Sequence, residues 1–104
     1  MEYLNKKENK LVNLTSKVIL LDNKKTTIRL ANDEWEAINI ISQKENIKRN
    51  CLIELINSTK SQNINLTSSI RLFSIIYFYT ELLNLQKNTS NKQLPITEAI
   101  HGII

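Results

Sequence analysis

The stretch KKTTIRLANDEW, residues 24–35, changes its pattern halfway along and thereby decides the fold. Through Leu30 the apolar residues alternate with polar ones, which is the pattern of a strand with one buried face. From Asn32 onward the chain offers a side-chain oxygen for a helix cap, and the acidic pair that follows suits the positive end of a helix dipole. We therefore expect a strand to run into a helix with almost no loop between them.

Length and composition favour one small, mostly helical domain. The chain has 104 residues, and its single Gly and single Pro leave little of the turn chemistry that a multi-stranded sheet needs. Cys51 is alone, so it can form neither an internal disulfide nor a cysteine metal cluster. Because the sequence offers no nucleophile triad, paired carboxylates or glycine-rich phosphate loop, we expect a protein that is not an enzyme and has no cofactor or metal.

Positive charge is concentrated at the start of the chain. Residues 1–30 contain seven Lys or Arg residues against three acidic ones, and this surplus of four equals the net charge of the whole chain. Such an uneven distribution is typical of a surface that binds a polyanion, although a solubilising tail has the same composition. The start of the chain lacks the apolar core of a secretory signal, and no apolar run is long enough to span a membrane. We expect a cytoplasmic protein with no membrane partner.

The pattern divides the chain into three parts. Residues 1–14 are expected to be a flexible basic arm, residues 15–86 the folded domain, and residues 87–104 a tail that forms a short last helix or frays. Within the domain we expect a short strand, a turn, a second strand and three helices, over residues 17–21, 22–23, 25–30, 33–44, 49–60 and 67–86. The third helix is apolar around most of its circumference, which indicates burial by its own domain on one side and by a partner subunit on the other.

Several short segments of the sequence resemble a known family that has this order of strands and helices. TTIRL (26–30) followed by EW (34–35) resembles a ribbon-helix-helix domain of the Arc and methionine repressor superfamily. NIKRNCLIELI (46–56) and NLTSSIRLFSIIYFY (65–79) are similar to a bacterial subfamily with an additional third helix, and LTSKVILLDNKKTTIRL (14–30) matches its two-segment beginning. The resemblance covers about residues 14–84. It implies a mostly α fold with a short β-ribbon, completed in an intertwined homodimer, because one strand or one hairpin is not a stable sheet by itself.

The resemblance implies sequence-specific binding of double-stranded DNA, with the ribbon in the major groove. Lys25, Thr27 and Arg29 lie on the face of the strand opposite Ile28 and Leu30. Arg can bond guanine bidentately, Thr can bond either base type or touch the thymine methyl group, and Lys can reach a base or a phosphate. We expect these three residues to contact bases, although a solvated outer face of a dimerisation ribbon would show the same alternation.

The resemblance also implies a phosphate contact at the start of the second helix, where free N–H groups and the helix dipole favour an anion. The matching residues are Lys48, Arg49 and Asn50. Here the sequence departs from the family pattern, because Lys48 stands in place of the usual Ser or Thr cap and Asn46 in place of the usual Gly. Asn tolerates the left-handed backbone that Gly supplies at a helix end, so we expect the turn to be kept.

Trp35 and Arg71 are expected to have structural roles. Trp35 is in phase with Ile38 on the first helix, which predicts a core anchor rather than a platform for base stacking. Arg71 matches the family pattern in the third helix, and we expect it to form an ion pair with Glu54 or Glu36 rather than to contact DNA.

Two classes of function fit these observations. The first is a dimeric DNA-binding regulator, either a transcriptional repressor or the DNA-binding half of a toxin–antitoxin pair, which acts as a dimer or as a higher oligomer on DNA. The second is a protein-interaction or dimerisation module that binds a protein partner through the third helix and the tail. Binding to DNA from upstream of the protein's own coding region would separate them.

Overall fold

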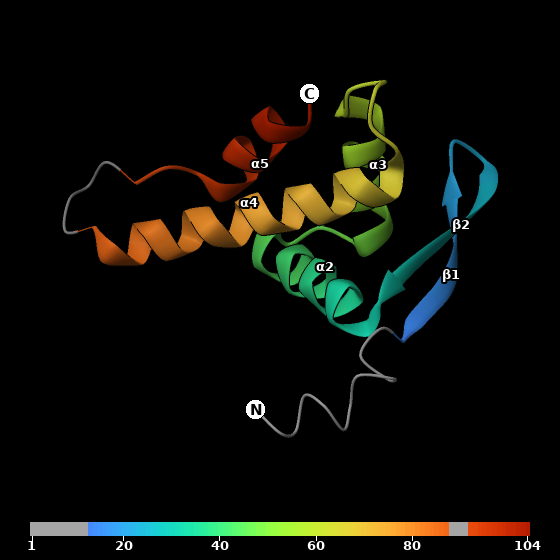
Figure 1. Ribbon diagram of the computed structural model, residues 1–104, viewed down its shortest axis with the longest axis horizontal. Coiled ribbons are helices and arrows are strands. Elements are labelled where there is room, and N and C mark those ends of the chain that lie inside the picture. The colour runs from blue at the N-terminus through green and yellow to red at the C-terminus, as the bar shows by residue number, and fades with distance from the viewer. Residues whose placement is uncertain (1–12, 88–91) are drawn as a thin grey trace.

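The computed structural model describes residues 13–87 and 92–104, and Figure 1 shows a two-stranded ribbon followed by four helices. The elements are β1 Leu14–Leu21, β2 Lys24–Ala31, α2 Asn32–Glu45, α3 Arg49–Thr59, α4 Leu66–Gln86 and α5 Pro95–Ile103. The predicted strand pair and three helices are confirmed, and residues 95–103 of the predicted tail form a further helix. Residues 1–12 of the predicted basic arm lie outside the described residues.

β1 and β2 form an antiparallel hairpin with a two-residue loop. Asp22 and Asn23 in the loop have φ angles of 50° and 65°, which is the left-handed backbone of a type I′ turn. Asp and Asn are the residues other than Gly that adopt this conformation most readily. On β2, Ile28 and Leu30 point toward the helices and are buried, so the alternation in residues 24–31 produces one buried and one exposed face.

The junction between β2 and α2 has no loop, as predicted, but its capping group is different. The prediction that Asn32 caps α2 is wrong, because Asn32 is already helical and its Oδ1 accepts a hydrogen bond from Thr15 Oγ1 at 2.6 Å. Glu34 reaches back instead and accepts a hydrogen bond from the N–H of Ala31 at 2.8 Å. The chain enters the helix one residue earlier than expected, which leaves Glu34 as the acceptor nearest the free backbone N–H.

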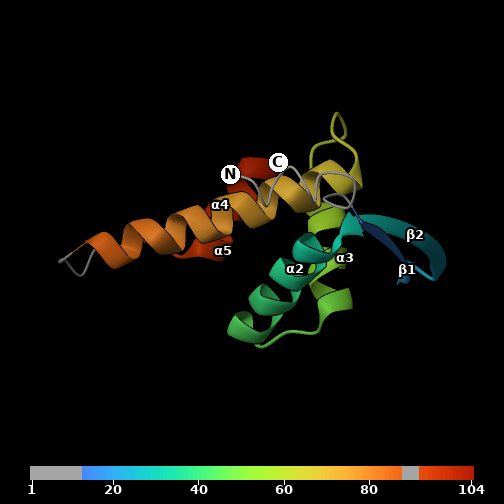
Figure 2. The same cartoon turned by 60° about the horizontal axis from the view of Figure 1, so that its bottom comes forward.

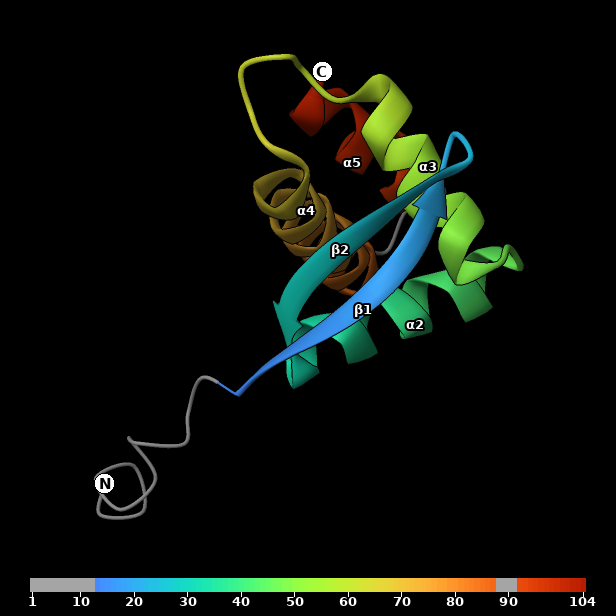
Figure 3. The same cartoon turned by 90° about the vertical axis from the view of Figure 1, so that its right-hand side faces the viewer.

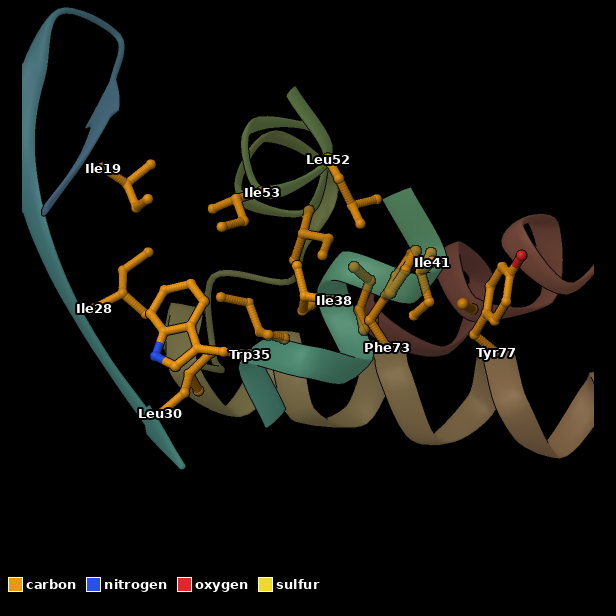
Figure 4. Close-up of a cluster of buried hydrophobic side chains, with 14 of the residues drawn as sticks. Ile19, Ile28, Leu30, Trp35, Ile38, Ile41, Leu52, Ile53, Phe73 and Tyr77 are labelled. Carbon is orange, nitrogen blue, oxygen red and sulfur yellow. The ribbon is translucent and has the colours of Figure 1, made fainter. Parts of the chain in front are cut away.

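One apolar core joins the hairpin to all four helices (Figure 4). Trp35 is only 3% exposed and packs in this core, which confirms its predicted role as an anchor. The helices contribute completely or almost completely buried side chains: Ile38 and Ile41 from α2, Leu52, Ile53 and Ile56 from α3, Ile70, Phe73 and Tyr77 from α4, and Ala99 and Ile103 from α5.

α4 is the longest helix and contacts each of the other three. α2 and α3 pack against α4 from its start as far as Glu81, which forms an ion pair with Lys44 of α2, and the end of α4 projects beyond them (Figure 2). α5 runs back along α4 and ends against α3. The Oδ1 of Asn65 accepts a hydrogen bond from the N–H of Ser68 at 2.7 Å and caps the start of α4. The hydroxyl of Tyr77 donates a hydrogen bond to Glu45 at 2.6 Å; burial, together with this bond, raises the pKa of Tyr77.

Arg71 forms an ion pair, but with a partner other than the two expected. Its Nε lies 2.6 Å from Glu34 Oε2, so the prediction of Glu54 or Glu36 is wrong. Burial opposes the charge on Glu34, but the hydrogen bonds from Arg71 and from the N–H of Ala31 outweigh it and hold the pKa of this carboxyl below its ordinary value. One carboxylate therefore caps α2 and also fastens α2 to α4.

Replacing Trp35 with Ala should lower the free energy of unfolding by about 3–5 kcal/mol, because it leaves a large cavity between the hairpin and the helices. Urea denaturation followed by circular dichroism measures this change. Trp35→Phe is the control and should cost less, since it keeps most of the ring. Unchanged stability together with lost DNA binding would instead make Trp35 a contact residue.

Candidate nucleic-acid interface

The three candidate base-contacting residues lie together on the outer face of the hairpin. Lys25, Thr27 and Arg29 occupy alternate positions of β2 and are all exposed. They point away from the core because Ile28 and Leu30, which lie between or beside them in the sequence, are buried in it. The structure therefore places the three residues on one accessible surface.

β1 contributes further side chains to this outer face, which the sequence analysis did not assign. The strand register sets three of them directly beside the candidates: Ser16 opposite Arg29, Val18 opposite Thr27, and Leu20 opposite Lys25. Val18 and Leu20 are exposed although they are apolar. No acidic residue occurs in either strand, so the face combines positive charge with methyl groups. The short apolar run of residues 17–21 indicated a strand but not which of its faces is exposed, and only the register reveals which residues become neighbours.

The second candidate set lies at the start of α3. Asn46 ends α2 with φ 58° and ψ 44°, which confirms that Asn keeps the left-handed turn usually made by Gly. Lys48 is the N-cap residue of α3, and its side chain makes no capping hydrogen bond. Arg49 and Asn50 are the first two helical residues, and the first turn contains no acidic residue. The backbone N–H groups of this turn therefore have no capping side chain or carboxylate from their own helix to compete with an anion.

Trp35 connects the hairpin with the start of α3. Its Nε1–H donates a hydrogen bond to the carbonyl oxygen of Thr15 on β1 at 2.8 Å. The guanidinium carbon of Arg49 lies 5.3 Å from the centroid of the indole ring, and Lys17 Nζ lies 5.5 Å from it. Both cations are within the range of cation–π attraction. One buried ring thus contacts the inner face of the hairpin through Lys17 and the second candidate set through Arg49.

The contacts of Lys17 and Arg49 with Trp35 could not be predicted from the sequence. The three residues lie on β1, α3 and α2, and no short spacing in the sequence links them. The Nε of Arg49 is buried and has no hydrogen-bond partner among the described residues, so stacking on Trp35 is the contact that positions this side chain.

An open groove of about 600 Å³ separates the end of α2 from the start of α3. Lys48 and Arg49 line it together with polar residues of α2, among which is the carboxylate of Glu36. An anion in this groove would meet both signs of charge, whereas the outer face of the hairpin carries only positive charge. Electrostatics therefore favour the hairpin as the main surface for a polyanion.

A family model described as ribbon-helix-helix domain matches residues 14–78. This match covers more than half of the chain, and the chain belongs to the ribbon-helix-helix family. The resemblance drawn from its sequence is confirmed. Proteins of this family typically bind DNA and dimerise, they are often transcription regulators or antitoxins, and they are typically not enzymes.

A solved structure with a similar fold is that of an uncharacterized protein from Bordetella pertussis Tohama I. The superposition has a TM-score of 0.65 and covers 95% of this chain and 84% of that chain, at 18% sequence identity. At this identity the likeness shows the fold alone. A comparison with curated proteins found no significant match. In the part of the chain that the structure describes, no group of three or more potential metal ligands occurs and no helix is suited to cross a membrane.

The contact between Arg49 and Trp35 predicts that two neighbouring basic residues differ in their effect on stability. Arg49→Ala should lower the free energy of unfolding by about 1 kcal/mol, because it removes a partly desolvated cation–π contact. Lys48→Ala is the matched control and should change stability by less than about 0.5 kcal/mol, as expected for an exposed side chain. Urea denaturation followed by Trp35 fluorescence measures both. Equal effects would show that stacking on Trp35 does not hold Arg49.

Proposed function

We propose that this protein is a dimeric, sequence-specific DNA-binding regulator, acting in the cytoplasm as a transcriptional repressor, and that its paired hairpins enter the major groove. The observation that carries the proposal is the outer face of β2, where Lys25, Thr27 and Arg29 are exposed side by side on a strand whose other face is fixed in the core. The hydrogen-bond donors of all three side chains and the methyl group of Thr27 can contact base edges in the major groove. Family membership supports the same function.

The free edge of β2 supports a symmetric dimer. β1 occupies one edge of β2, and no described strand pairs with the other edge. Antiparallel pairing of β2 with β2 of a second copy would place these two strands at the centre of a four-stranded sheet. Strands lie about 4.8 Å apart and the major groove is about 12 Å wide, so the central pair fits into the groove and the β1 strands lie above its walls. We therefore assign base contacts to β2.

We assign phosphate contacts to the start of α3, through Lys48, Arg49, Asn50 and the free N–H groups of the first turn. The uncapped helix start and its missing acidic residues support this assignment, because the positive end of the helix dipole favours an anion. The stacking of Arg49 on Trp35 would hold its guanidinium in place before DNA arrives. Less conformational entropy is then lost on binding.

A dimer predicts that thermal stability depends on protein concentration. Association stabilises the folded state by mass action, so the melting temperature should rise as the protein concentration is increased from about 1 to 100 µM. Differential scanning calorimetry over this range measures the effect. A melting temperature that stays constant, with a monomeric mass in sedimentation, would contradict the dimer.

Base and phosphate contacts predict different consequences for DNA binding. Arg29→Ala should lower discrimination at one base pair in each half-site by about 1–3 kcal/mol and leave non-specific affinity nearly unchanged. Fluorescence anisotropy with labelled DNA from upstream of the coding region, and with variants of each base pair, measures this. Arg29→Lys keeps the charge but loses the bidentate geometry, so it should also lose discrimination.

Lys48→Ala is the contrasting variant. As a phosphate contact it should weaken binding to every sequence alike and reduce the slope of log affinity against log salt by about 0.9. Lys92→Ala removes the same charge from a residue beyond α4, far from the hairpin, and should change neither quantity (Figure 1). A dimer that binds no DNA even at low salt would contradict the proposed function.

The alternative is a protein-interaction module, including antitoxin-type binding of a partner. The observation that favours it is a set of exposed apolar side chains on α4: Ile75, Tyr79 and Leu82. In that case Tyr79→Ala should abolish partner binding and Arg29→Ala should leave it unchanged. If Arg29→Ala instead weakens specific DNA binding and Tyr79→Ala does not abolish binding to a protein partner, the result supports the regulator.

A further inference from the structure

α4 presents one apolar side to solvent, which we call the α4 outer face: Ile75, Phe78, Tyr79 and Leu82. Ile75, Tyr79 and Leu82 are 66%, 59% and 53% exposed. They are spaced four and three residues apart, so they follow one line along the helix. A contiguous exposed apolar surface of this kind usually marks an interaction site. The opposite side of α4 is covered by α5 (Figure 1).

The α4 outer face continues into a groove of about 410 Å³ between α4 and α2. Ala37, Ile70 and Phe78 are among the apolar residues that line this α2–α4 groove. The ion pair between Arg71 and Glu34 also lines it, with 2.6 Å between its charged atoms. Because Arg71 has its counter-charge within the same chain, covering the groove does not leave this guanidinium buried without a partner.

A second copy needs more apolar area than the edge of β2 can supply. The inner faces of α2 and α3 are already filled by the chain's own helices, since Ile38, Ile41 and Ile53 are completely buried. Pairing of β2 strands alone gives little area, because an eight-residue strand is about 26 Å long and exposes only a narrow edge. A stable interface buries about 800 Å² on each partner. The remaining area must come from a surface next to the free edge of β2.

α4 lies on that side of the molecule. α4 contacts β2, whereas α3 contacts β1. Figure 3 shows the same arrangement from the hairpin side: α4 lies beside β2, on the side away from α3. A second copy that pairs along the free edge of β2 therefore approaches α4 and the α2–α4 groove rather than α3 or α5.

We infer that the α4 outer face and the α2–α4 groove form one continuous interface with a second copy of this chain, together with the free edge of β2. This inference rests on the strand-paired dimer of the proposed function and names the surface that completes it. Two-fold symmetry places the same residues on both sides, and apolar residues such as Tyr79 and Leu82 can meet their own copies without charge repulsion. α4 thus closes the core with one side and joins the copies with the other.

The test replaces two exposed residues of the α4 outer face, Ile75→Lys and Leu82→Lys, in the full chain. Both side chains are largely exposed in one chain, so the far-UV circular dichroism spectrum should be unchanged. Burying added charges in an apolar interface is unfavourable, and the dimer dissociation constant from sedimentation equilibrium should rise by about tenfold or more. Hydrogen exchange of the β2 amides should become faster as the strand edge is released.

The matched control is Leu94→Lys with Ile104→Lys. It changes one leucine and one isoleucine that are 68% and 65% exposed and adds the same charge. These residues flank α5, which lies across α4 from α2 (Figure 1), and the control should keep the wild-type dissociation constant. The inference is overturned if the first variant dimerises like the wild type, if the control loses as much affinity, if β2 exchange does not follow dissociation, or if the wild type is a monomer.

DNA binding separates this inference from the function on which it rests. A wild-type dimer that binds DNA but is unaffected by Ile75→Lys with Leu82→Lys refutes the interface and keeps the regulator. A dimer that these substitutions dissociate, but that binds no DNA, supports the interface and refutes the regulator. Both measurements use the same purified protein. The dimer dissociation constant tests the interface, and DNA binding tests the regulator.

Discussion

The indole of Trp35 is the contact on which the arrangement of the hairpin and the helices depends. α2 follows β2 without a loop, so a side chain in the first turn of α2 sits directly beneath the hairpin. The ring is buried, donates a hydrogen bond to Thr15 on β1, and has the cations of Lys17 and Arg49 near its faces. The orientation of the outer face of the hairpin and the position of the start of α3 are therefore set by the same ring.

The contacts of Trp35 with the hairpin and with Arg49 would also affect how the protein binds DNA. A surface arginine normally loses side-chain freedom when it binds a phosphate, but Arg49 is already packed against Trp35. On β2, the exposed candidates are held by the burial of their neighbours Ile28 and Leu30. In both places the rigid core supplies the orientation, and the exposed atoms are left free for a ligand.

α4 explains why one chain can have a nearly complete core in so small a domain. It covers the apolar sides of α2 and α3, and α5 covers α4 in turn. The ion pair between Arg71 and Glu34 and the hydrogen bond from Tyr77 to Glu45 fasten α4 to α2. α4 also leaves Ile75, Tyr79 and Leu82 exposed on its outer face.

The order of the strands and helices was predictable from the sequence because the signals are local. The alternation of apolar and polar residues identified the face of β2 that carries Lys25, Thr27 and Arg29. Asn46 was identified as the residue that ends α2 because Asn tolerates a left-handed backbone conformation. The errors concern choices between nearby groups of similar chemistry. Asn32 and Glu34 both offer oxygens for the cap of α2, and the partner of Arg71 depends on how α4 crosses α2.

The sequence by itself determined the period of each element and therefore which residues share a strand face or a helix side, because backbone geometry imposes periods of two and of about 3.6. Only the tertiary structure decided which faces meet. The pairing of Val18 with Thr27 follows from the hairpin register, and the stacking of Arg49 on Trp35 follows from the packing of α3 against α2. These contacts join residues that are distant in the chain, and their free energy depends on the simultaneous packing of several elements, which no local pattern encodes.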